Sequence, residues 1–160
     1  MPRRTWLPIA VGVLAATGLE AQTVKVSRLD ESTYRYAVTE ERRSIFAANL
    51  ALGPEERERF WTIYDEYGKE REPLDKERFS LLQRYAQSYA NLSDDQAMAL
   101  ALASGRLQVS EVELRLKYAA TLRRKMSGRI AARFFQIDDY VTTAMRMNFL
   151  SGVPLVAPTQ

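Results

Sequence analysis

The residues that could do chemistry in this chain are its carboxylates, because the sequence contains neither histidine nor cysteine. Acidic residues cluster at two predicted helix starts, at Glu55, Glu56, Glu58, Asp94 and Asp95. Carboxylate oxygens suit calcium and other hard cations, whereas an ordinary structural zinc site would need the missing residue types. Helix capping and the helix dipole already explain all five acids. We therefore expect no metal site, and a carboxylate cation binder remains an alternative.

A second group of acids could perform general acid-base chemistry. Asp138 and Asp139 are adjacent, as are Asp65 and Glu66, but nothing in the sequence brings the two pairs into one pocket. We predict that all four lie on solvated helix faces. The helical serines lack a histidine to activate them: Ser44, Ser80, Ser88 and Ser110. The sequence predicts no catalytic residue, no cofactor and no enzyme.

Two joints between helices organise the chain around these residues. In the first, Leu52 and Gly53 precede Pro54, which suits the first position of a helix, and Glu56 follows. In the second, Leu92 precedes Ser93, an expected N-cap whose capping box Gln96 completes. Joints of this kind predict helical hairpins.

The apolar spacing predicts four helices, with a long second helix that Pro73 kinks or breaks. Strand alternation is missing, so the expected fold is all-α, an elongated four-helix hairpin architecture. For the second helix we predict a core stripe at Phe60, Tyr64, Tyr67, Leu74, Leu81 and Tyr85. For the third we predict one at Met98, Leu102, Gly105, Val109, Val112, Leu116, Ala119 and Met126, widened by Leu100, Leu107, Leu114 and Leu122.

Charge and the N-terminal sequence indicate an exported protein. The net charge of +3 comes from 23 basic and 20 acidic residues that are interspersed, which does not suit nucleic-acid binding. Residues 1–21 are typical of a signal peptide, with Arg3 and Arg4 before a short apolar run and cleavage near Ala21. An uncleaved membrane anchor is the alternative. We expect a flexible tail at 22–31, a helical domain at 32–151, a C-terminal tail at 152–160, and a periplasmic location without stable membrane insertion after cleavage.

Aromatic residues on the second helix suggest a surface for binding other proteins. Most of them must be core, but a thin helical protein cannot cover both faces of one layer, and an apolar surface rimmed by arginine would remain. The candidate residues are Phe60, Trp61, Tyr64, Tyr67, Arg57, Arg71 and Phe135. Binding of unfolded clients and formation of a homodimer would both use this surface.

The two joints resemble a family motif. Leu52 to Glu56 and Leu92 to Gln96 look like degenerate copies of the Leu-Thr-x-x-Gln motif of the Spy/CpxP periplasmic proteins, and Arg133 to Asp138 is similar to an Arg-Phe-Phe-Gln-Ile-Glu stretch of uncharacterised exported proteins in that group. The first copy departs from the motif at Gly53, Pro54 and Glu56. The resemblance implies a four-helix hairpin fold, a cradle-shaped dimer, and a role as an ATP-independent chaperone or envelope-stress modulator. The alternative function is an interaction module that binds one dedicated envelope partner.

Overall fold

The computed structural model describes residues 31–150 and 155–156 of the chain. These residues form four α-helices and one short 3-10 helix, without a strand: α2 (Glu31–Asn49), α3 (Pro54–Ser88), η2 (Tyr89–Asn91), α4 (Asp94–Lys125) and α5 (Gly128–Leu150). The all-α prediction of four helices with a long second one is confirmed. The predicted signal peptide and N-terminal tail lie outside the described residues, as does most of the predicted C-terminal tail.

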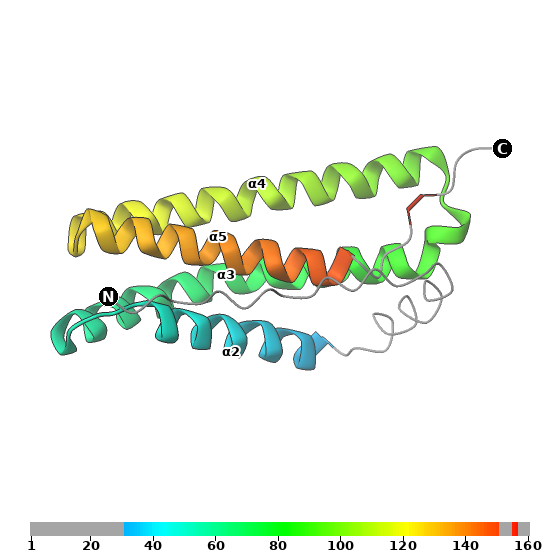
Figure 1. Ribbon diagram of the computed structural model, residues 1–160. Helices are drawn as coiled ribbons and strands as arrows, with labels where there is room; N and C mark the ends of the chain where they lie inside the picture. Colours follow the sequence, from blue (N-terminus) through cyan, green and yellow to red (C-terminus); the bar gives the residue numbers. More distant parts are fainter. Residues whose placement is uncertain (1–30, 151–154, 157–160) are drawn as a thin grey trace, which may run out of the picture.

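The four helices make an elongated bundle in which neighbours in sequence run antiparallel (Figure 1). Short connections enforce this arrangement, because a few residues can only return the chain alongside the helix it has left. Both α3 and α5 pack against α2, and both also pack against α4, so the bundle closes into a ring of four contacts. None of the helices in the described part is long and apolar enough to cross a membrane.

Both predicted joints start their helices as expected. Gly53 is the N-cap of α3, and its N–H donates to Oε2 of Glu56 at 3.2 Å, while Pro54 takes the first helical position. At α4, Oγ of Ser93 accepts from the N–H of Gln96 at 3.3 Å, and Oε1 of Gln96 accepts from the N–H of Ser93 at 3.0 Å. These bonds satisfy backbone donors that the first helical turn leaves without partners.

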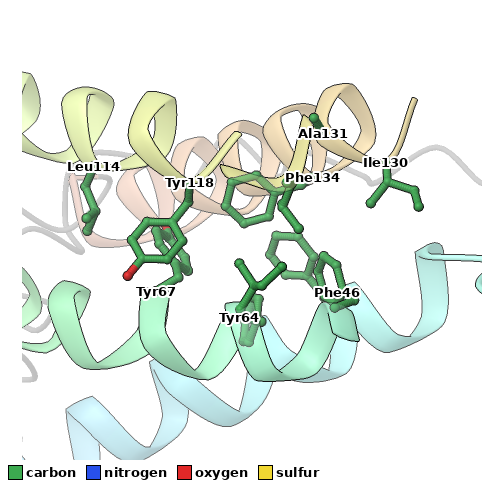
Figure 2. Packing of buried hydrophobic residues seen from close by; sticks show 11 residues of the cluster. Phe46, Tyr64, Tyr67, Leu114, Tyr118, Ile130, Ala131 and Phe134 are labelled. Carbon is green, nitrogen blue, oxygen red and sulfur yellow. The ribbon is translucent and has the colours of Figure 1, made fainter. Parts of the chain in front are cut away.

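An aromatic core fills the end of the bundle where α2 joins α3 and α4 joins α5 (Figure 2). Phe46 of α2 lies at its centre, with its ring centroid 4.9 Å from that of Tyr64 and 5.5 Å from that of Phe134. Tyr67 meets Phe134 edge to face at 5.3 Å. Tilted and edge-to-face contacts of this kind add to the stabilisation from burial. A smaller apolar cluster of Val38, Phe79 and Met145 lies further along the bundle.

Two predictions about the helices can be compared with the structure: the kink or break at Pro73, and the core stripe of α4. The helix α3 continues through Pro73 without a break, and Pro73 is exposed, on the side where a missing backbone bond is easiest to accommodate. The central line of the predicted core stripe of α4 is wrong, whereas three of the residues predicted to widen it, Leu107, Leu114 and Leu122, are buried. The large members of that line from Met98 to Leu116 are exposed, and the buried face instead carries Leu107, Glu111, Leu114, Arg115, Tyr118 and Leu122. Two charged residues lie in that buried face, which made it look solvated in the sequence.

Candidate functional site

A layer of buried charge crosses the bundle between the two apolar clusters. Every helix contributes to this polar layer, whose members are Arg42, Arg71, Asp75, Glu111, Arg115 and Asp138. Three positive and three negative side chains therefore leave water together when the protein folds. Removing charges from water is costly, so each of them needs partners inside the protein.

Asp138 is the centre of the polar layer and is completely buried. Its Oδ1 accepts from Nη1 of Arg42 at 2.5 Å and from Oη of Tyr67 at 2.7 Å. Its Oδ2 accepts from Nε of Arg115 at 2.8 Å. Burial alone would raise the pKa of Asp138, but the Arg42 and Arg71 charges and the hydrogen bonds outweigh it and hold this pKa below its usual value. Asp138 therefore stays ionised and links α5 to the three other helices.

Glu111 of α4 forms ion pairs with a second set of arginines. Its Oε2 is 2.5 Å from Nη2 of Arg78 and 3.6 Å from Nη2 of Arg146, and its Oε1 is 3.5 Å from Nη2 of Arg71. Arg71 also donates from Nη1 to Oη of Tyr67 at 2.9 Å. Since Tyr67 donates to Asp138, one continuous network joins Glu111 to Asp138.

Asp75 is held more loosely than the other two buried acids. Its Oδ2 lies 3.5 Å from Nε of Arg71, which is an ion pair without hydrogen-bond geometry. Burial raises the pKa of Asp75 above its usual value, although the Arg71 and Arg42 charges oppose the rise. Incomplete pairing of this kind favours the protonated form of a carboxyl group.

The sequence contains a signal for the polar layer. Charged residues stand four positions from core residues on the same helix face, as Arg42 does between Val38 and Phe46, and Asp138 does after Phe134. The prediction that Asp138 is solvated is therefore wrong. Its neighbour Asp139 is exposed and accepts from Nη1 of Arg115 at 2.7 Å.

The four acids considered for acid-base chemistry do not come together. Asp65 is exposed on α3, where it pairs with Arg43 at 2.5 Å, and Glu66 is exposed beside it. A groove with a volume of about 470 Å³ between α2 and α3 is lined in part by Tyr64, Tyr67, Arg71 and Asp75. Burial raises the pKa of both tyrosines, so their hydroxyls are neutral hydrogen-bond donors. The hydrogen bonds and ion pairs of the buried residues form a network that holds the helices together.

The acidic residues in the first turns of α3 and α4 also lie far from one another. Glu55 and Glu56 are in the first turn of α3, and Asp94 and Asp95 are in the first turn of α4. Because α4 begins where α3 ends, about 50 Å of helix separates the two groups at 1.5 Å per residue. Across the described ranges, no group of three or more potential metal ligands is close enough to hold an ion.

The predicted binding surface on α3 is mostly core. Phe60, Tyr64 and Tyr67 are buried in the aromatic cluster, and Arg71 belongs to the polar layer, so these four are not available to a partner of the folded protomer. The reason is that α2 covers one side of α3 and α4 covers the other, which leaves little of the aromatic face uncovered.

The remaining three predicted residues reach the surface to different extents. Trp61 is half-buried, with Cζ of Arg43 4.3 Å from its ring centroid. Phe135 is half-buried near Arg115, whose Cζ is 5.4 Å from the ring centroid. Arg57 is exposed and donates to the carbonyl oxygen of Leu52 at 3.4 Å. These three do not form a continuous apolar patch.

The longest line of exposed apolar side chains in the described residues lies instead on α4. Its large members are between 42% and 58% exposed, although they are aliphatic or thioether side chains that burial would stabilise. They follow one line along the helix together with an exposed glycine, and we call this set the α4 stripe: Met98, Leu102, Gly105, Val109, Val112 and Leu116. Contiguous apolar surface on a helix is typical of a site that binds another protein.

Comparisons with protein-family models, with curated proteins and with solved structures gave no match. The function therefore has to be argued from the residues and their geometry.

Proposed function

We propose that this chain is an exported, non-catalytic helical protein that binds other proteins through the α4 stripe. In this proposal it works in the periplasm as an ATP-independent chaperone or envelope-stress adaptor. The observation that carries the proposal is the α4 stripe itself, in which five large apolar side chains, from Met98 to Leu116, are exposed along one helix. An exposed surface of this kind can bind the apolar segments of an unfolded chain or the apolar face of a partner helix.

The rest of the molecule supports a binding role. The polar layer ties all four helices together, so α4 is held as a rigid platform by Arg115 and Glu111 on its inner face. Basic residues flank the stripe on its outer face, at Arg106 and Lys117. The edge of the stripe therefore carries both signs of charge, because Lys117 pairs with Glu70 of α3 and the exposed Glu113 lies between the two basic residues in the sequence.

A dedicated envelope partner is the second candidate, and the spacing of the stripe favours it. Steps of four and three residues alternate from Met98 to Leu116, which is the repeat by which two helices pack along their length. One partner helix with a matching repeat would cover the stripe completely. Crosslinking in cells from a photoreactive residue at Leu102 distinguishes the candidates, because a dedicated partner gives one dominant adduct and a chaperone gives many.

The test of the chaperone function is suppression of aggregation of a denatured protein, without ATP, by a several-fold excess of the purified chain. We expect suppression by the wild type and loss of suppression in Leu102→Ser/Val109→Ser/Leu116→Ser. The matched control is Tyr140→Ser/Met147→Ser, which removes exposed apolar side chains from α5. Equal activity of all three proteins would contradict the assignment to α4, and inactivity of the wild type would contradict a chaperone.

The proposed export depends on the N-terminal sequence. Residues 1–21 have the charged start and short apolar run of a signal peptide, and cleavage near Ala21 would release the rest of the chain. Mass spectrometry of the protein recovered from a periplasmic extract tests this. A mass that begins at Gln22 is expected, whereas the full-length mass in a membrane fraction would favour the anchor.

A further inference from the structure

We propose that a second copy of this chain covers the α4 stripe, with the two α4 helices packed antiparallel about a two-fold axis between Val109 and Val112. This inference rests on the proposed function in one respect, namely that the stripe is the binding surface. It adds the identity of a partner and the geometry of the pair. It also implies that a second copy and an unfolded client compete for the same face of α4.

The spacing of the stripe is the first argument. A repeat of seven residues with apolar positions at alternating steps of three and four places those side chains along a line that a second helix can follow. In α4 this line extends from Met98 to Leu116. A second α4 carries the same line, and with the axis between Val109 and Val112 the two stripes face one another from Gly105 to Leu116. A closed pair with two-fold symmetry uses one self-complementary patch of this kind.

Gly105 is the second argument. It lies in the middle of α4 on the exposed face, where a helix-interior glycine costs about 1 kcal/mol relative to alanine. A Cβ atom built on Gly105 would meet nothing within 4 Å, so no packing inside the protomer requires the glycine. A partner helix would require it, because the missing side chain leaves a hollow in the stripe. In the proposed antiparallel pair, the partner's Leu116 lies opposite Gly105 and fills that hollow.

The charges beside the stripe are the third argument, and they select the orientation. Arg106 and Glu113 are both exposed and stand seven positions apart on the same side of the stripe. The two-fold axis brings Arg106 opposite the partner's Glu113, and the same contact recurs on the other side of the axis. In a parallel pair the same edge of one helix faces the other edge of its partner, so Arg106 and the partner's Glu113 would lie on opposite sides of the interface and could not meet. Complementary charges at the edge of an interface fix its alignment more than they add affinity.

The expected dimer is reversible. Only one helix of each copy contributes to the interface, and small interfaces, below roughly 1,200 Å², are typical of weak and transient complexes. Dissociation at low concentration would then free the stripe for other proteins.

Charge reversal tests the alignment. In sedimentation experiments on the purified chain we expect Arg106→Glu and Glu113→Arg each to raise the dimer dissociation constant about tenfold, because each places like charges opposite one another. The double variant Arg106→Glu/Glu113→Arg restores opposite charges and should restore the wild-type constant. Arg129→Glu, at an exposed arginine of α5, is the matched control and should leave it unchanged. Additive weakening in the double variant would overturn the antiparallel pair.

Single cysteines test the geometry directly, since the chain has no cysteine of its own. Val109→Cys lies next to the axis and should form a disulfide-linked dimer under mild oxidation. Leu102→Cys should not, because the two positions are separated by about 25 Å along an antiparallel pair at 1.5 Å per residue. Efficient linking at Leu102 would indicate a parallel pair and contradict the proposal.

The aggregation assay separates this inference from the proposed function. A chain that stays monomeric at all concentrations but still suppresses aggregation through the stripe would refute the dimer and leave the binding function intact. A chain that dimerises with the expected charge dependence but suppresses nothing would refute the chaperone function and retain the dimer.

Discussion

Arg42 and Asp138 are 96 positions apart in the sequence, yet Nη1 of Arg42 and Oδ1 of Asp138 are 2.5 Å apart in the interior of the bundle. This ion pair joins the first described helix to the last one. It also places a full negative charge where Tyr67 and Arg115 can reach it from the two remaining helices. The closure of the bundle therefore depends on polar contacts as well as on its aromatic core.

Asp138→Asn should destabilise the protein strongly, because it leaves the buried Arg42 and Arg115 without their shared carboxylate. Loss of one partner from a buried ion pair typically costs about 3–5 kcal/mol. Urea unfolding followed by circular dichroism measures the change. Asp139→Asn is the control, since that side chain is exposed, and it should shift the free energy of unfolding by less than about 1 kcal/mol. Similar losses in both variants would contradict the central position of Asp138.

Asp75→Asn should have the opposite effect at neutral pH. The pKa of Asp75 is raised in the folded protein, so the folded state binds its proton more tightly than the unfolded state does. The ionised carboxylate therefore lowers stability at pH values above the folded pKa, and this penalty disappears below the unfolded pKa of about 3.9. We expect Asp75→Asn to be as stable as the wild type or more stable at pH 7, with any gain vanishing on acidification. A variant that is less stable at pH 7 would indicate that the pair with Arg71 outweighs the burial of Asp75.

The two faces of α4 should respond differently to truncation. Leu114→Ala removes a buried side chain and should lower the free energy of unfolding by about 2–5 kcal/mol. Leu116→Ala removes an exposed one and should change it by no more than about 0.5 kcal/mol at low protein concentration. Thermal unfolding of the two variants side by side provides the measurement. The reverse order would mean that the line from Met98 to Leu116 is the buried face of α4.

Pro73→Ala should stabilise the protein. A proline inside a helix costs about 3 kcal/mol, because it removes a backbone hydrogen bond and crowds the preceding turn. Pro54→Ala is the matched control, because a proline in the first turn of α3 removes no such bond and should give no gain. A lower melting temperature for Pro73→Ala would mean that the packing of α3 requires the proline.

Local signals in the sequence predicted the helices and their starts well. Gly53, Pro54, Ser93 and Gln96 act within one turn of chain, so their effect can be read without knowledge of the fold. The number and order of the helices followed from these joints and from the apolar spacing between them.

The buried face of α4 and the polar layer could not be predicted from local sequence signals. On α4 the residues from Met98 to Leu116 form a more regular apolar line than the true core face, which includes Glu111 and Arg115. Whether a charge is buried depends on partners that lie far away in the sequence, such as Arg78 for Glu111. Hydrophobic spacing contains no information about those partners, and it therefore centres the predicted core on the exposed line from Met98 to Leu116.

The polar layer has one more consequence, for the alignment of the helices along the bundle axis. Apolar side chains tolerate displacement of a helix by one turn, about 5.4 Å, because one aliphatic or aromatic contact can replace another. Asp138 does not tolerate it. If α5 slid by one turn in either direction, this carboxylate would leave Arg42 and Arg115 and approach one of the two apolar clusters, where an unpaired charge is strongly disfavoured. The ion pairs thus select one axial alignment among several that the apolar core alone would accept.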